Sequence, residues 1–102
     1  MTAYNVVRFR VKPGKDQAFI DSQSAAMQGP MQGFLGGGLI KTGERSYCLV
    51  GRWASYEDIV AARPQMIAIL DKTRPLLEDL GGGVGVTDPV SGPTVFELGP
   101  GM

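Results

Sequence analysis

Hydrophobic and polar residues alternate near the start of the chain, between Tyr4 and Val11. Because the side chains of a β-strand point alternately to its two faces, this pattern predicts a strand with one apolar and one amphipathic face. The apolar face is expected to pack against helices. It carries Asn5, Val7, Phe9 and Val11, and the opposite face carries Tyr4, Val6, Arg8 and Arg10.

A second alternating segment, from Arg45 to Trp53, predicts another strand. Ser55 follows it and suits the N-cap of a helix that begins near Tyr56. One face of this strand is expected to carry Arg45, Tyr47, Leu49, Gly51 and Trp53, and the other Ser46, Cys48, Val50 and Arg52.

The remaining segments complete a βαββαβ order. Prolines at positions 64 and 75 predict that the second helical region is broken into two or three segments, and glycines 36–38 indicate a bulge or a close approach in the second strand. Asp88-Pro89 and Ser91-Gly92-Pro93 are typical of consecutive turns. The expected elements are a helix over Lys15–Gln28, a strand over Leu35–Thr42, helical segments between Tyr56 and Leu80, and a last strand over Thr94–Leu98.

This order predicts one domain over residues 1–102, with an antiparallel sheet covered by helices on one face. The uncovered face would carry Val6, Cys48 and Val50 beside its arginines. An exposed apolar sheet face usually marks an interface. The pattern therefore favours a homodimer.

Two local features are similar to a known family. Trp53 stands at the end of a strand where a helix begins, and the first strand ends in Lys12-Pro13-Gly14-Lys15. This combination resembles the antibiotic-biosynthesis-monooxygenase-like branch of the dimeric α/β-barrel superfamily. The resemblance implies an α+β, ferredoxin-like fold paired into a dimeric α/β barrel.

The resemblance leaves two functions open, because this superfamily holds both enzymes and proteins of no known activity. One is a cofactor-free monooxygenase or related enzyme acting on an aromatic or anionic small metabolite. For such enzymes the resemblance implies that the substrate itself, in its anionic form, activates oxygen. Asn, Trp, Tyr and Arg side chains of the pocket would orient the substrate. The alternative is a non-catalytic dimer that binds a small ligand or serves a stress or regulatory role.

Four residues are candidates for a ligand pocket: Trp53, Tyr47, Asn5 and Arg63. Trp53 alone is matched to the family by position, and both core filling and a place in a pocket wall are open to it. The other three are residue types that the implied chemistry needs.

Haem-degrading members of the family use an Asn on the first strand, this Trp and an axial His ten residues beyond it. Arg63 stands at the His position, and Val7 occupies the place that matches the Asn, two residues after Asn5. The chain contains no histidine and one cysteine, Cys48, which is expected to be a small buried hydrophobe. No haem, other cofactor or metal is therefore expected, and a Ser-His-Asp arrangement is impossible.

Composition and net charge limit the classes of binding partner that the sequence predicts. The net charge is zero and no apolar run is long enough to cross a bilayer, so neither nucleic acid nor membrane is expected. The glycine clusters do not fit dinucleotide or phosphate-loop spacing. No secretory leader opens the sequence, which favours a cytoplasmic protein.

Charge is unevenly spread along the chain: residues 1–52 hold seven of its ten Lys and Arg, and residues 53–102 hold seven of its ten Asp and Glu. This asymmetry fits basic strands with a solvated acidic helix, or a basic strand face that holds an anionic ligand or an acidic neighbour.

Overall fold

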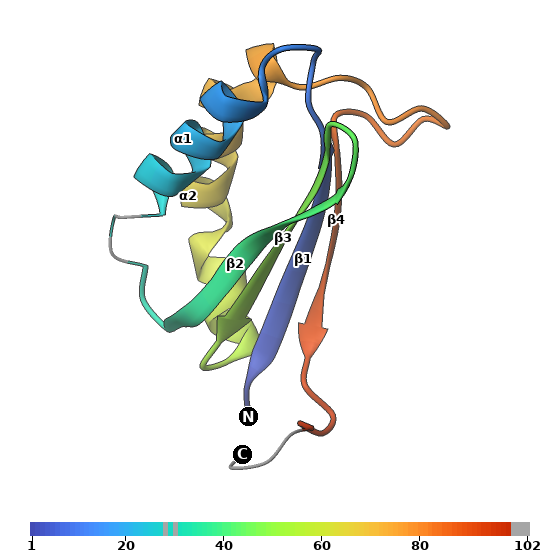
Figure 1. Cartoon of the computed structure of the whole chain (residues 1–102). Coiled ribbons are helices and arrows are strands. Elements are labelled where there is room, and N and C mark those ends of the chain that lie inside the picture. The colour runs from blue at the N-terminus through green and yellow to red at the C-terminus, as the bar shows by residue number, and fades with distance from the viewer. Residues whose placement is uncertain (28, 30, 99–102) are drawn as a thin grey trace.

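The computed structural model describes residues 1–27, 29 and 31–98, and it contains a four-stranded antiparallel sheet with two helices on one face (Figure 1). The strand order β2-β3-β1-β4 is that of the predicted ferredoxin-like α+β fold. The strands are β1 (Ala3–Arg10), β2 (Phe34–Gly43), β3 (Ser46–Trp53) and β4 (Thr87–Pro93). The helices are α1 (Asp16–Ala26) and α2 (Tyr56–Thr73), followed by the 3-10 helix η1 (Arg74–Leu76).

The two faces predicted for β1 and β3 are confirmed. Asn5 pairs with Gly51, and Phe9 pairs with Tyr47 across the two strands. Residues paired in this way share one face of a sheet. Asn5, Phe9 and Tyr47 are all buried, as expected of the face that meets the helices.

The second helix runs through Pro64 without a break, so the predicted interruption at that residue is wrong. Ser55 caps the helix as predicted, because its Oγ accepts a hydrogen bond from the Asp58 backbone N–H at 3.2 Å. Pro64 is exposed, whereas Ile59 and Ala62 are buried against the sheet. Packing of this apolar face offsets the hydrogen bond that proline removes. The α-helix ends before Pro75, as predicted.

The predicted end of the first helix at Gln28 lies outside the described residues. Neither described helix combines the length and the apolar character that crossing a membrane requires.

The last strand is not where the sequence predicted it. Thr87–Pro93, expected to form turns, is β4, and Thr94–Leu98 forms no strand. The error arose from two prolines, Pro89 and Pro93, which argue against a central strand. β4 lies at the edge of the sheet and pairs with β1 alone, and an edge strand tolerates residues that lack an N–H donor.

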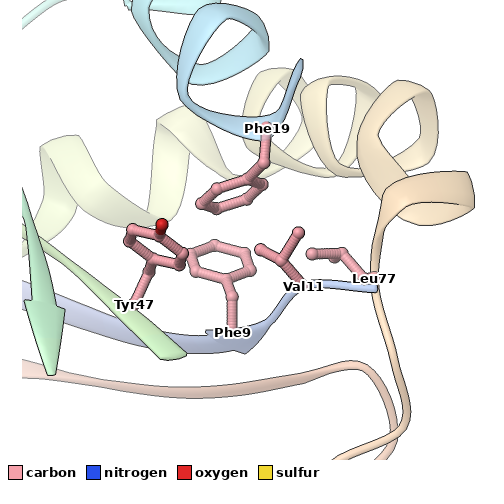
Figure 2. Packing of buried hydrophobic residues seen from close by; sticks show 5 residues of the cluster. All are labelled: Phe9, Val11, Phe19, Tyr47 and Leu77. Atoms are coloured by element: carbon pink, nitrogen blue, oxygen red, sulfur yellow. The ribbon is translucent and has the colours of Figure 1, made fainter. Parts of the chain in front are cut away.

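Two hydrophobic clusters lie at opposite ends of the sheet. One contains Phe9, Val11, Phe19, Tyr47 and Leu77, which converge from the sheet, α1 and the segment after η1 (Figure 2). The other contains Ala3, Trp53, Ile59 and Ala62. The sheet register places β1 residues Asn5 and Val7 between these clusters, and this stretch carries the candidate site.

Candidate functional site

The floor of the candidate site is a row of four residues, one from each strand. Gly37 pairs with Gly51, Gly51 with Asn5, and Asn5 with Ser91. Two of the four have no side chain, so half of this row leaves the space above the sheet unfilled. We call this row the glycine floor.

A cavity of about 870 Å³ lies above the glycine floor, between the sheet and the two helices. Large apolar side chains make most of its walls, as in typical small-molecule sites. The walls include Leu39, Leu49 and Trp53 from the sheet, Met27 directly after α1, and Ile59 and Met66 from α2.

Asn5 and Trp53 form a hydrogen-bonded pair in this cavity. The indole Nε1–H of Trp53 donates to Asn5 Oδ1 at 2.7 Å, and both side chains are buried. The bond fixes the amide, whose Nδ2 group lies 3.9 Å from the sulfur of Met66. A thioether is a weak acceptor, so the amide N–H groups keep donor capacity that a ligand oxygen could use.

Gly51 is required for this pair to form. A Cβ atom at position 51 would lie 2.4 Å from Asn5 Oδ1 and 3.0 Å from Trp53 Nε1. The first separation is shorter than real Cβ contacts and the second is tight, so an added side chain would displace the Asn5 amide. The glycine therefore creates space for the pair as well as for the cavity.

A second polar group lies at an exposed edge of the cavity. Arg63 from α2 and Ser91 from β4 line the cavity there, and Tyr56 of α2 lies behind the lining and contacts Arg63. We call these three residues the polar edge. Arg63 Nη2 donates to the Tyr56 hydroxyl oxygen at 3.1 Å, and its guanidinium carbon lies 5.9 Å from the centre of the Tyr56 ring. The guanidinium, followed by the Ser91 hydroxyl, holds the pKa of Tyr56 below its ordinary value.

The cavity wall carries little charge. Of the described residues that line it, Arg63 alone is ionisable. The uncharged polar side chains in the wall include Asn5, Gln23 and Ser91. The described residues contain no group of three or more His, Cys, Asp or Glu side chains placed to hold a metal ion.

Tyr47 is the sequence-predicted site residue that lies outside this arrangement. Its ring packs 5.3 Å from that of Phe19 in the first cluster (Figure 2), and its hydroxyl donates to Asp16 Oδ2 at 2.6 Å. This carboxylate, together with burial, raises the pKa of Tyr47. Tyr47 therefore ties β3 to the start of α1 and does not reach the cavity wall.

The structure brings Trp53, Asn5 and Arg63 to one cavity, with Arg63 at its exposed edge. Sequence reasoning did not select Ser91, because its segment was taken for turns. It also did not select Gln23, a buried polar residue of α1 that donates to Thr73 Oγ1 at 3.3 Å. The spacing of Phe19 and Gln23, one helical turn apart, was the available signal.

We predict that Tyr56 ionises at a lower pH than Tyr47. Arg63 favours the Tyr56 phenolate, whereas Asp16 favours the neutral Tyr47 phenol. The hydrogen bond of Tyr47 therefore stabilises the fold below pH about 10 and is lost as the pH rises through its elevated pKa. Ultraviolet difference titration of the wild type, Tyr47→Phe and Tyr56→Phe measures the order. Arg63→Met should move the Tyr56 step to higher pH, and an unchanged step would contradict the contact.

The fold is shared with several solved proteins. A cofactor-independent oxygenase from Streptomyces nogalater, SnoaB, solved as an Asn-to-Ala variant, superposes with a TM-score of 0.73 at 16% identity over 95% of this chain and 96% of its own. Rv0793 from Mycobacterium tuberculosis gives 0.76 at 14% identity over 97% and 100%. A candidate antibiotic biosynthesis monooxygenase from Chloroflexus aurantiacus gives 0.71 at 17% identity over 97% and 98%.

No family model and no curated protein sequence matches the chain. The structural similarity thus shows that this chain has the fold of antibiotic-biosynthesis-monooxygenase-like proteins, as the sequence predicted. At such identities it carries no residue roles to this chain.

Proposed function

We propose that this protein is a cofactor-free monooxygenase or related enzyme acting on an aromatic or anionic small metabolite. The observation that carries the proposal is the buried hydrogen bond between Asn5 on the floor and Trp53 in the wall of an apolar cavity. The pair presents a fixed amide donor and the indole of Trp53 to whatever occupies the cavity. That combination suits a planar ring with an oxygen substituent.

The proposed chemistry needs a substrate that becomes an anion and gives electrons to O₂. An amide N–H that donates to the substrate oxygen stabilises the negative charge as it develops. The positive charge of Arg63 acts in the same direction from the edge of the cavity. The structural similarity to a cofactor-independent oxygenase supports this reaction class.

Non-catalytic ligand binding is the second candidate, and one feature of the wall favours it. Arg63 is the one ionisable side chain among the described lining residues, so none of them is a conventional proton acceptor. A substrate that is not already acidic would stay protonated in such a cavity.

The proposed oxygenase reaction is therefore restricted to substrates that ionise readily, such as acidic phenols, enols and related compounds.

Oxygen uptake with a hydroxylated anthrone as substrate tests the proposal. Each anthrone oxidised to the quinone consumes one O₂ and releases one water, and a metal chelator in the buffer excludes adventitious metal. Protein should accelerate uptake above spontaneous oxidation. Asn5→Asp keeps an acceptor for Trp53 but removes the amide donors, and should lower the rate on the order of a hundredfold. Bound anthrone without accelerated uptake would favour the non-catalytic function.

We also propose that the protein acts as a homodimer joined through the open sheet face. The centre of this face is an apolar row in which Val50 pairs with Val6, and Val6 with Val90. Val90 is 62% exposed, and Ile40 beside the row is 53% exposed. The segment after β4 adds more exposed apolar surface: Val95, Phe96 and Leu98.

Charged groups lie at the margins of the open face. Arg8 forms a salt bridge with Asp88, and Arg52 forms one with Glu97. An apolar centre with a charged rim is the usual composition of a protein interface. A second copy that covers this face would remove the apolar row from water.

Val50→Asp is predicted to convert the dimer to a monomer at micromolar concentration. The substitution would place an unpaired carboxylate in the buried contact, where its desolvation is not compensated. Sedimentation velocity measures the change, with Val60→Asp on the exposed side of α2 as control. A wild-type protein that sediments as a monomer would contradict the dimer.

A further inference from the structure

We infer that the polar edge is a carboxylate-binding site. Arg63, Tyr56 and Ser91 hold the carboxylate of an aromatic acid whose ring lies on the glycine floor beside Trp53. The inference rests on the proposal that the cavity binds a ligand, and it adds the charge, the chemical group and the orientation of that ligand.

The charge of Arg63 is not neutralised by a described carboxylate. Salt bridges in the described part of the chain occupy Arg8, Arg45, Arg52 and Arg74. The Arg63 side chain donates instead to the Tyr56 hydroxyl oxygen. A guanidinium at the edge of an apolar cavity attracts an anion more strongly than one in open solvent does.

Tyr56 and Ser91 add two hydroxyl donors to this charge. Tyr56 packs against the second cluster, which holds its ring in place, and its hydroxyl reaches Arg63. Ser91 is held by its pairing with Asn5 across β4 and β1. Arg63, followed by Ser91, lowers the pKa of Tyr56 from its ordinary value, and this makes the phenol O–H a stronger hydrogen-bond donor.

The donors fit a carboxylate better than a single oxygen. A guanidinium presents parallel N–H groups that bind two carboxylate oxygens at once. Two hydroxyls can satisfy further lone pairs, of which a carboxylate has about four. No described lining residue carries a negative charge that would repel such a ligand.

The rest of the cavity defines the other end of the ligand. Ser91 and Asn5 are neighbours on the glycine floor, so a ring joined to a carboxylate at the polar edge would extend over Asn5 towards Trp53. The apolar side chains of Leu49 and Met66 would then lie beside the ring. These positions describe an aromatic acid of one or two rings.

Isothermal titration calorimetry with 2-naphthoate and the neutral amide 2-naphthamide tests the inference at pH 7 and low salt. The wild type should bind the acid more tightly than the amide, by on the order of tenfold to a hundredfold. Arg63→Met should remove this preference and leave amide binding unchanged. Tyr56→Phe should reduce the preference in part. Lys12→Met, which removes a positive charge from an exposed turn, is the matched control and should retain it.

The outcomes separate the two proposals. Equal binding of acid and amide overturns the carboxylate site and leaves the cavity as a ligand site. Failure of both compounds to bind overturns the inference together with the binding part of the proposed function. Loss of the preference in Lys12→Met as well would assign it to overall charge, and would also overturn the inference.

Discussion

Replacement of Trp53 by alanine is expected to lower the free energy of unfolding by about 3–5 kcal/mol. Trp53 is 1% exposed, and its ring packs edge to face with that of Phe34, with 5.1 Å between the ring centres. The substitution would enlarge the existing cavity and leave Asn5 Oδ1 without its donor. A loss of this size is a large part of the stability of a small domain.

Urea unfolding of Trp53→Ala and Trp53→Phe separates packing from hydrogen bonding. Phenylalanine retains most of the ring but lacks the Nε1–H group, so its stability should lie between those of the wild type and the alanine variant. Phe96→Ala is the control, because Phe96 is 70% exposed and its truncation should change stability little. Trp53→Ala with wild-type stability would contradict the buried position of Trp53.

The second large effect is expected at Gly51, where alanine should cost about 1–3 kcal/mol through overpacking. The new methyl group would displace the Asn5 amide, which lies 2.4 Å from its position, and so weaken the bond to Trp53. Loss of that bond would leave buried polar atoms unpaired and add to the cost. Ligand binding should weaken in the same variant because the floor is then occupied.

Gly92→Ala provides the matched control for Gly51→Ala. A Cβ at position 92 meets no atom within 4 Å, and Gly92 lies on the open face of the same sheet. Its effect on stability should stay within about 0.5 kcal/mol. Equal denaturation midpoints for the two variants would show that Gly51 does not maintain the pair.

Much of the fold could be predicted from local patterns. The alternation between Tyr4 and Val11 and between Arg45 and Trp53 identified two strands and the face that each buries. These are the central strands β1 and β3. Their alternation is clear because each has a neighbouring strand on both sides and one face covered by helices, which fixes the residues that must be apolar. Ser55 correctly predicted the start of α2 because an N-cap bonds to a backbone N–H only a few residues further along the chain. Such an interaction is visible in the local sequence.

The errors lie where tertiary context outweighs local preference. Proline lowers the strand propensity of Thr87–Pro93, but the edge position removes the penalty, and edge position is not visible in the segment itself. The same holds for Pro64, whose cost is offset by the buried face of α2.

The site was partly predictable for the same reason. Trp53 and Asn5 were selected, but their hydrogen bond depends on the strand register that brings Asn5 opposite Gly51. Tyr47 shares the face of Trp53, yet five residues of extended strand separate the two and place Tyr47 in the other cluster. Ser91 reaches the site only through the pairing of β4 with β1.

Fluorescence of Trp53 tests the central claim most directly, that the cavity is a site for a small aromatic ligand. Trp53 is the single tryptophan of the chain and lines the cavity, so its emission reports on the site alone. Titration with a hydroxynaphthoquinone, an aromatic quencher, should give saturable quenching with a stoichiometry of one bound molecule per chain. Quenching that rises linearly without saturation, as it does for free N-acetyltryptophanamide, would contradict the account.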